Sequence, residues 1–255
     1  MEIPVCCKQE LFYRVGKGRG SLPVVAARLP VAAVTLAYCA DPDEFFRLYL
    51  AEEEQAELSS FRWPQKKFPW LAARVAAKRL YCRYKRGRGE IFHPRDVVIR
   101  KIRAGPGRGK PLLRVDGPAA STFFSDFSLS HAGQWAVCAL ASYGRVGIDL
   151  EPVEDLSPSF IRTVYTPGEM ETLQTIAGSF TLSERVKLLW VMKESLLKAL
   201  GVGFYYGLGS VRLTGANEAG PVFTTAPDLP ALPGRPVNMS YGFFKGCVFC
   251  ITLIC

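Results

Sequence analysis

The chain has 255 residues, 49% of them hydrophobic and 22% charged, which is enough for one large domain or two modest ones with their own cores. No apolar run reaches the roughly 18 residues of a membrane span, and Met1-Glu2 opens without the basic segment of a signal peptide, so we expect a cytoplasmic protein. The net charge of +9 indicates an acidic partner: nucleic acid, an anionic membrane, a polyphosphate or an acidic protein.

The first half of the chain predicts alternating strands and helices. We expect a strand at residues 31–38 and a helix that begins at Asp41-Pro42-Asp43, where acidic residues suit the positive end of the helix dipole. A second helix is predicted at residues 70–84, because apolar residues recur there at helical spacing. Strands are predicted at residues 97–102 and 135–141.

The second half repeats this pattern after a turn at Gly144-Arg145. A strand is predicted at residues 146–151, and Thr166 and Glu169 have the spacing of a capping box with Pro167 between them. A second capping box at residues 181–184 predicts a helix that ends near Leu200, before Gly201. Residues 211–213 and 247–254 are predicted closing strands.

The predicted fold class is therefore α+β, in two similar halves. We divide the chain into an N-terminal extension of undetermined structure (residues 1–30), an N-terminal α+β subdomain (31–143) and a C-terminal one (144–255). Eight cysteines lie mostly in apolar surroundings. Because paired CxxC motifs are missing and only two histidines are present, we expect reduced, buried thiols rather than structural zinc or disulfides.

Two carboxylates alternate along the predicted strand at residues 146–151. Asp149 and Glu151 share one face of it, while Ile148 and Leu150 share the other. Two acids on one face repel each other unless water or a cation lies between them, and a hard divalent ion such as magnesium resolves that repulsion. A solvated strand edge with two surface acids is the alternative interpretation.

Glu194 lies in the predicted helix at residues 187–200, four residues after Trp190 and four before Lys198. An exposed ion pair with Lys198 is the ordinary interpretation of this spacing. The residues around Glu194 are largely apolar, however, and an unpaired charge among them is costly. This cost makes Glu194 a candidate for a function in a site.

Two further segments carry candidate ligand-binding residues. His131, one of two histidines, is followed by Gly133, which permits a ligand to approach the backbone; a purely structural histidine is the alternative. The segment at residues 104–111 is similar to a phosphate-binding Walker A loop. That motif requires Ser or Thr after the lysine and then a helix; here Pro111 follows Lys110, and the next residues do not predict a long helix.

Taken together, four segments in this order resemble the Sfp-type 4′-phosphopantetheinyl transferase family. They are Gly109-Lys110-Pro111, Phe127-Ser-Leu-Ser130-His131-Ala-Gly133, Val146-Gly-Ile-Asp149-Leu-Glu151, and Trp190-Val-Met-Lys-Glu194-Ser-Leu-Leu-Lys198. Ser128 replaces the commoner asparagine and Ala132 replaces a hydroxyl residue, but neither change removes a ligand. Residues 1–30 lie outside the resemblance.

The resemblance implies a pseudo-twofold pair of α+β halves with coenzyme A in the cleft between them. It implies Mg²⁺, with Mn²⁺ as a substitute, held by Asp149, Glu151 and Glu194. The residues that it implies for coenzyme A are mainly cations and their neighbours: Lys110 with Gly109 and Pro111, Ser130, His131 and Lys198, and by a looser alignment Arg74, Lys66 and Lys67.

The implied reaction transfers 4′-phosphopantetheine from coenzyme A to a serine of an acyl or peptidyl carrier protein and releases 3′,5′-ADP. Glu194 is our first choice for the base and Glu151 the second, with Lys198 and His131 completing the predicted catalytic set. We expect an acidic carrier protein as partner, no nucleic acid or membrane, and a monomer. Residues 160–165 are either a docking surface or part of the core.

Two other functions remain open on the sequence alone. A Walker-type nucleotide kinase or ATPase is suggested by residues 104–110. A basic nucleic-acid-binding protein is suggested by the net charge and by residues 81–88, where basic and aromatic residues alternate.

Overall fold

The structure is a computed structural model that describes residues 11–14, 23–87, 89–105, 107–115, 126–218, 220–229, 232 and 237–255. The first half consists of β1 (Leu11–Arg14), β2 (Pro23–Pro30), α1 (Val31–Ala40), α2 (Pro42–Tyr49), α3 (Glu52–Ser59), α4 (Pro64–Arg86), β3 (Val97–Lys101), β4 (Pro111–Val115), β5 (Asp126–Ala132) and β6 (Trp135–Ala141). The second consists of β7 (Arg145–Pro152), α5 (Pro158–Val164), α6 (Pro167–Ala177), α7 (Leu182–Leu200), β8 (Val211–Asn217), β9 (Gly220–Thr225), β10 (Val237–Phe244) and β11 (Cys247–Ile254).

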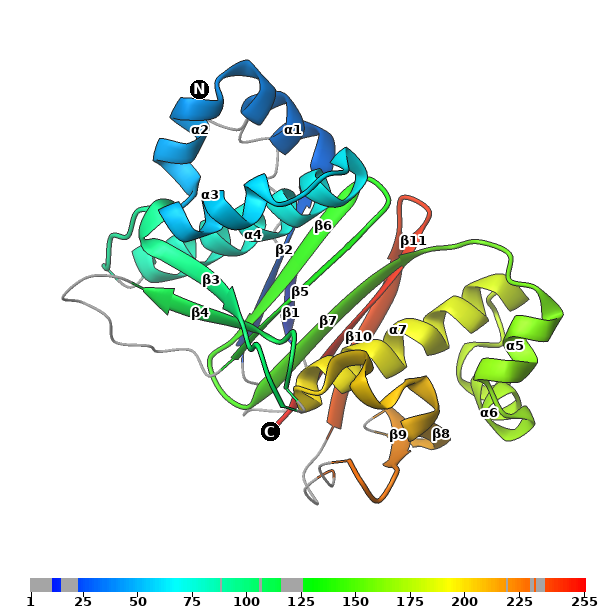
Figure 1. Ribbon diagram of the computed structural model, residues 1–255. Coiled ribbons are helices and arrows are strands. Elements are labelled where there is room, and N and C mark those ends of the chain that lie inside the picture. Colours follow the sequence, from blue (N-terminus) through cyan, green and yellow to red (C-terminus); the bar gives the residue numbers. More distant parts are fainter. Residues whose placement is uncertain are drawn as a thin grey trace.

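The two halves have the same topology, which confirms the predicted α+β class with a repeated architecture (Figure 1). Each half begins with a strand, continues through short helices into one long helix, and then forms two antiparallel hairpins. The main sheets have the corresponding orders β2-β6-β5 and β7-β11-β10, with β1 added beside β2. The remaining hairpins are β3-β4 and β8-β9. The connection at residues 142–144 separates the two repeats.

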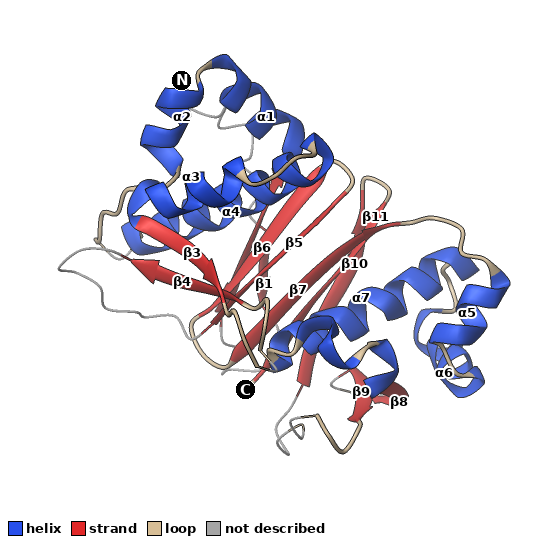
Figure 2. Cartoon of the chain, in the orientation of Figure 1, coloured by secondary structure: helices blue, strands red, loops and turns tan. Residues whose placement is uncertain are grey.

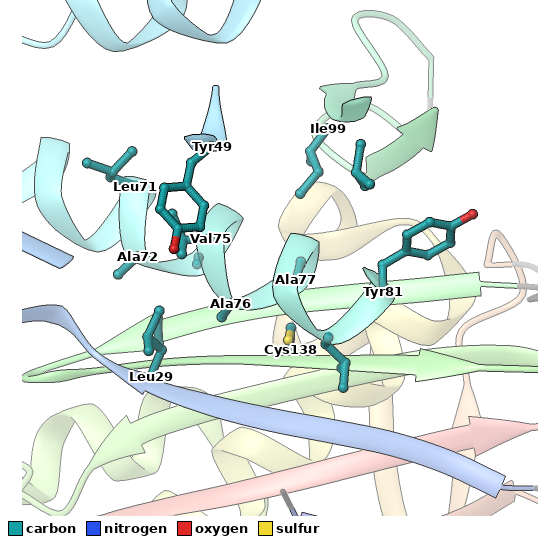
Figure 3. Close-up of a cluster of buried hydrophobic side chains, with 14 of the residues drawn as sticks. Leu29, Tyr49, Leu71, Ala72, Val75, Ala76, Ala77, Tyr81, Ile99 and Cys138 are labelled. Carbon is teal, nitrogen blue, oxygen red and sulfur yellow. The ribbon is translucent and has the colours of Figure 1, made fainter. Parts of the chain in front are cut away.

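The long helix α4 covers the first sheet (Figures 2 and 3). Its small residues, including Ala72, Ala76 and Ala77, are buried and permit close contact with β2 and β6, where Leu29 and Cys138 complete the packing. Burial of this apolar face, at about 25 cal/mol per Å², is the main source of stability for a helix of this kind. The predicted helix at residues 70–84 is thus confirmed and is longer at both ends.

The second long helix, α7, has the predicted ends. The Thr181 side chain accepts a hydrogen bond from the Glu184 amide, and Glu184 in turn accepts one from the Thr181 amide, which satisfies two free donors of the first turn. Gly201 ends the helix in the left-handed region, at φ 81°. The helix packs against β7 and β11 of the second sheet.

Apolar side chains from the two main sheets form a third core that joins the halves. Val24 and Val137 of the first sheet belong to one buried cluster with Ile148 of β7 and Phe249 of β11. The two sheets are therefore packed against each other, while α4 and α7 cover their other faces (Figure 2).

Two sequence predictions are wrong. Residues 31–38 were predicted as a strand, but they form most of helix α1. The alanines of this segment favour a helix, and the Thr35 hydroxyl donates to the Val31 carbonyl one turn earlier. Residues 23–30, assigned above to an extension of undetermined structure, form β2 in the interior of the first sheet. The segment Gly16–Gly20 lies outside the described residues.

The cysteines that the structure describes are free thiols, four of them buried. Cys247 and Cys250 have the CxxC spacing, but they belong to different core clusters, because residues three apart on a strand point to opposite faces. Across the described residues, no helix combines the length and the apolar composition that a bilayer span requires.

Candidate active site and metal centre

Three carboxylates from distant parts of the chain converge between β7 and α7. One oxygen from each of Asp149, Glu151 and Glu194 lies within 4.8 Å of the others. Asp149 and Glu194 are buried and Glu151 is half-buried. The alternative of a solvated strand edge with two surface acids is therefore wrong for Asp149, which is 2% exposed.

A glycine makes this convergence possible. Gly147 lies on β7 directly beneath α7, and a Cβ atom at that position would be 1.8 Å from the Ser195 carbonyl oxygen. Because no side chain separates the two backbones, α7 lies close enough for Glu194 to reach the carboxylates of β7.

Asp149 has one satisfied oxygen and one free oxygen. Its Oδ1 accepts hydrogen bonds from Lys198 Nζ at 2.6 Å and from Ser130 Oγ at 2.8 Å. Its Oδ2 is buried and has no hydrogen-bond partner among the described residues. A buried carboxylate oxygen without a donor is costly, and it faces two further acids. This set of hard oxygen donors fits a divalent cation such as Mg²⁺.

Burial and the closeness of the three acids raise the pKa values of Glu194 and Glu151. Burial, with the nearby charge of Asp149, raises the pKa of Glu194 to about 8. Burial and the charge of Asp149 also raise the pKa of Glu151. At neutral pH the metal-free cluster therefore keeps a proton on Glu194, and a cation that binds there displaces it.

This perturbation predicts how stability depends on pH without divalent ions. A carboxyl whose pKa is raised on folding stabilises the native state fully below its unfolded pKa, near 4.5, and that stability is lost as the pH rises toward 8. We therefore expect Glu194→Gln to raise the free energy of unfolding at pH 8, by roughly 1–3 kcal/mol, and to have little effect at pH 5. Urea unfolding in EDTA at the two pH values measures this; an equal effect at both would contradict it.

Side chains of β5 hold β7 in place. Asp126 Oδ2 accepts from the Val146 amide at 3.0 Å, and Ser128 Oγ accepts from the Ile148 amide at 3.1 Å. Ser130, two residues further along the same face, donates to Asp149. The alternate residues of β5 thus satisfy the free edge of β7 and orient a carboxylate of the cluster.

A cavity of about 380 Å³ lies beside the cluster, between the two halves. Glu194 and Lys198 of α7 line it from the second half, and the remaining cations line it from the first half. The described residues that line it include Arg74, Lys101, Arg108, Gly109, Lys110, Pro111, Ser130, His131 and Phe204. The lining is therefore rich in positive charge, apart from Glu194, and suits a ligand with several phosphate groups.

Lys110 connects the two halves at this cavity. Its Nζ pairs with Asp126 at 2.9 Å, and its side chain lies beside Gly201 at the C-terminal end of α7. The segment after it forms strand β4, which begins at Pro111, so the helix that a Walker A loop requires is not formed.

Arg74 is a buried cation of the first half that lines the cavity. Its guanidinium stacks 3.6 Å from the centre of the Trp70 ring, and Glu57 accepts from both residues. Lys101 Nζ lies 3.8 Å from the same carboxylate. Glu57 therefore holds two cations of the cavity wall in a defined arrangement.

The structure brings together most of the predicted site residues but not all. The cavity lining, within the described chain, does not include Lys66 or Lys67; Lys67 instead donates to the Tyr38 hydroxyl at 3.0 Å. The ion-pair partner of Lys198 is Asp149. Among the described residues, Lys198 forms no ion pair with Glu194. Two cations of the cavity lining, Lys101 and Arg108, were not predicted from the sequence. Arg108 belongs to the loop at residues 104–111, and Lys101 lies shortly before it.

An aromatic row continues outward from the cluster along the second half. The Trp190 ring lies one helical turn before Glu194, stacks on Phe160 at 5.8 Å and contacts Phe204 at 6.0 Å. Phe160 and Phe204 are exposed, whereas Tyr165 at the end of α5 is buried. The segment at residues 160–165 thus contributes both to the core and to the surface.

Comparison with known proteins agrees with these features. The family model of the 4′-phosphopantetheinyl transferase superfamily matches residues 145–232, which include all three carboxylates. A 4′-phosphopantetheinyl transferase of Aneurinibacillus migulanus is 33% identical over 102 residues, 40% of this chain and 39% of that protein. A Synechocystis sp. protein provisionally named 4′-phosphopantetheinyl transferase is 28% identical over 173 residues, 65% of this chain and 63% of its own length. The chain therefore covers less than two thirds of either relative.

Among solved structures, holo-[acyl-carrier-protein] synthase of Helicobacter pylori in complex with coenzyme A is 16% identical, with a TM-score of 0.33 over 43% of this chain and 99% of that one. That score is too low to establish a common fold. The chain is therefore similar to the 4′-phosphopantetheinyl transferase superfamily, through the family model over residues 145–232 and through the named relatives over part of their length.

Proposed function

We propose that this protein transfers the 4′-phosphopantetheine group of coenzyme A to a serine of a carrier protein and releases 3′,5′-ADP. The observation that carries the proposal is the carboxylate cluster of Asp149, Glu151 and Glu194 beside a cavity lined by cations. A nucleotide with a pyrophosphate and a 3′-phosphate matches both parts of this site: the cluster with its cation, and the basic wall.

Asp149, Glu151 and Glu194 would hold Mg²⁺, for which Mn²⁺ can substitute. When bound, the ion would draw negative charge from the pyrophosphate oxygens. Lys198, whose Nζ lies 2.6 Å from Asp149 Oδ1, would contact the same pyrophosphate, and Lys110 and Arg108 line the same cavity.

In the proposed step the serine hydroxyl oxygen of the carrier attacks the β-phosphorus of coenzyme A. A new O–P bond forms, the bond from that phosphorus to the bridging oxygen breaks, and the bridging oxygen leaves with 3′,5′-ADP. Lys198 stabilises the negative charge that develops on the leaving oxygen. The hydroxyl proton passes to Glu194, which lines the cavity, or to Glu151 as the second choice. His131, exposed at the cavity, would contact a phosphate with Ser130.

The rest of the cavity wall supports recognition of the nucleotide. We assign the 3′-phosphate to the cations that Glu57 organises, Arg74 and Lys101, with Arg108 nearby. Lys66 and Lys67, the looser candidates, would act only on a part of the ligand outside the cavity.

This assignment predicts a selective loss of affinity. Lys101→Ala with Arg108→Ala should raise KM for coenzyme A by about tenfold or more, because charge-assisted hydrogen bonds are each worth ~1.5–3 kcal/mol. KM for dephospho-coenzyme A, which lacks the 3′-phosphate, should change little. Steady-state kinetics with both donors measures the difference.

Arg100→Ala is the matched control, because Arg100 is next to Lys101 on β3 but pairs with Glu53 at the surface. If the double variant raised KM equally for both donors, the assignment of the 3′-phosphate would be wrong.

The acceptor would be an acidic acyl or peptidyl carrier protein. A net charge of +9 favours its approach by long-range attraction. The nucleic-acid alternative has less support, because two residues of the basic and aromatic segment, Tyr81 and Lys85, are buried, and Lys85 pairs with Glu90.

Mass spectrometry tests the proposal directly. An apo carrier protein incubated with this protein, coenzyme A and Mg²⁺ should gain about 340 Da, the mass of one phosphopantetheine group. No mass gain with acyl, peptidyl and fatty-acid carriers, or nucleotide turnover without any carrier, would contradict it.

A further inference from the structure

Lys193, the residue before Glu194, is fully buried and forms an ion pair inside the second half. Its Nζ lies 2.7 Å from Glu169 Oε1 on α6, with exposures of 0% and 2%, and 5.2 Å from the centre of the Tyr165 ring. The removal of two charges from water is costly, and their attraction compensates for it only when the geometry is good and further hydrogen bonds satisfy both groups. Lys193 therefore fixes one side of α7 to α6.

The partner of Lys193 is itself held by the backbone. Glu169 accepts hydrogen bonds from the Thr166 amide at 2.9 Å and from the Leu213 amide at 3.1 Å. One carboxylate thus joins the start of α6, the first strand of the β8-β9 hairpin and α7. It cannot shift without breaking backbone hydrogen bonds, so it is a rigid anchor for Lys193.

The residue after Glu194 is fixed to the opposite side. The Ser195 and Thr252 hydroxyl oxygens lie 2.7 Å apart, both buried, and the Ser195 carbonyl lies against Gly147. Three successive residues of α7 thus have three different partners: Lys193 contacts α6, Glu194 belongs to the carboxylate cluster, and Ser195 contacts the second sheet.

From this arrangement we infer that Lys193 is a positioning residue: its ion pair with Glu169, acting against the Ser195 contact, sets the rotation of α7 and so the position of the Glu194 carboxylate relative to Asp149 and Glu151. The inference rests on the proposed function, because it assigns Lys193 a role in the geometry of the metal centre. Lys193 itself is fully buried and belongs neither to the carboxylate cluster nor to the described lining of the cavity.

The first half contains an equivalent buried lysine–glutamate ion pair, but no carboxylate follows its lysine in the sequence. Lys78 of α4 is buried and pairs with Glu54, which accepts from the Ala51 amide at the start of α3 and from the Ile99 amide of β3, both at 3.2 Å. The residue after Lys78 is Arg79 rather than a carboxylate. The duplicated fold therefore provides a control: an equivalent ion pair that stabilises its half but does not adjoin the cluster.

The experiment compares Lys193→Met with Lys78→Met in the full chain. Thermal unfolding in EDTA should show lower melting temperatures for both, because each change leaves a buried carboxylate unpaired. Mn²⁺ titration followed by electron paramagnetic resonance should show an affinity about 10–100-fold weaker for Lys193→Met, as for other residues that orient metal ligands. The Mn²⁺ affinity of Lys78→Met should match that of the unmodified protein.

A second variant separates positioning from stability. Lys193→Met combined with Glu169→Gln removes both buried charges and keeps one side-chain oxygen that can accept from one of the two backbone amides, so much of the lost melting temperature should recover. Mn²⁺ affinity should stay weak. Recovery of Mn²⁺ affinity together with stability, or equal weakening by Lys78→Met, would overturn the inference. If the unmodified protein bound no Mn²⁺, the proposed metal centre would fail, and the inference with it.

Discussion

Glu194→Gln should lower kcat for phosphopantetheine transfer by about 10²–10⁴-fold, the usual contribution of a positioned acid or base. The substitution keeps the size of the side chain but removes a charge from the carboxylate cluster and the proposed proton acceptor. Measured in EDTA, coenzyme A affinity should change little, because the cations that line the cavity are untouched. Single-turnover kinetics and a separate measurement of coenzyme A binding distinguish the two effects.

Glu171→Gln is the control for this prediction, since Glu171 is an exposed acid of α6 outside the cluster. Its turnover should equal that of the unmodified protein. Wild-type turnover in Glu194→Gln would remove this residue from the chemistry, and a loss of coenzyme A binding as large as the loss of turnover would mean that it acts in binding instead.

Gly147→Ala should destabilise the protein by about 3 kcal/mol or more, as overpacking against a rigid backbone does. The added methyl group would lie 1.8 Å from the Ser195 carbonyl and 2.7 Å from the Ala199 amide nitrogen, so α7 must move away from β7. That movement also separates Glu194 from Asp149, and we expect transfer activity to fall even in the folded fraction. Urea unfolding and kinetics at 10 °C measure the two consequences.

Gly168→Ala provides the comparison. Gly168 lies in the first turn of α6, and a Cβ there meets no atom within 4 Å. Alanine at that position should leave stability unchanged or raise it by up to about 1 kcal/mol, because it restricts the unfolded chain. If Gly147→Ala were equally harmless, the close contact between α7 and β7 would not be what brings the carboxylates together.

Local signals in the sequence predicted much of the fold. The capping boxes at Thr166 and Thr181 and the terminal Gly201 set the ends of α6 and α7, because these residues satisfy free backbone groups at the helix termini. Alternation along residues 146–151 placed Asp149 and Glu151 on one face of β7. These features depend only on neighbours in the chain.

The errors arose where tertiary context or competing propensities decided the outcome. Segment 31–38 was predicted as a strand, but its alanines and leucine form a helix directly after β2 ends at Pro30. That β2 lies inside the first sheet could not be predicted locally, since its pairing with β6 joins residues more than a hundred positions apart.

The candidate site shows the same division. Charge and spacing in the sequence identified Asp149, Glu151 and Glu194 as candidate metal ligands. The distances between their carboxylates depend on Gly147 and on the side chains of β5, and these contacts are visible only in the folded structure. Lys101 was missed because its strand position gives no sign that it meets Arg74 across Glu57. Long-range contacts, rather than motifs, assemble the cavity.

The central claim is that three distant carboxylates form one site for a divalent ion that also holds the pyrophosphate of coenzyme A. Titration of the unmodified protein with Mn²⁺, followed by electron paramagnetic resonance with and without coenzyme A, tests this most directly. We predict one tightly bound Mn²⁺ per chain, bound more tightly when coenzyme A is present and lost in Asp149→Asn. Absence of stoichiometric binding, or binding that neither coenzyme A nor Asp149→Asn alters, would contradict it.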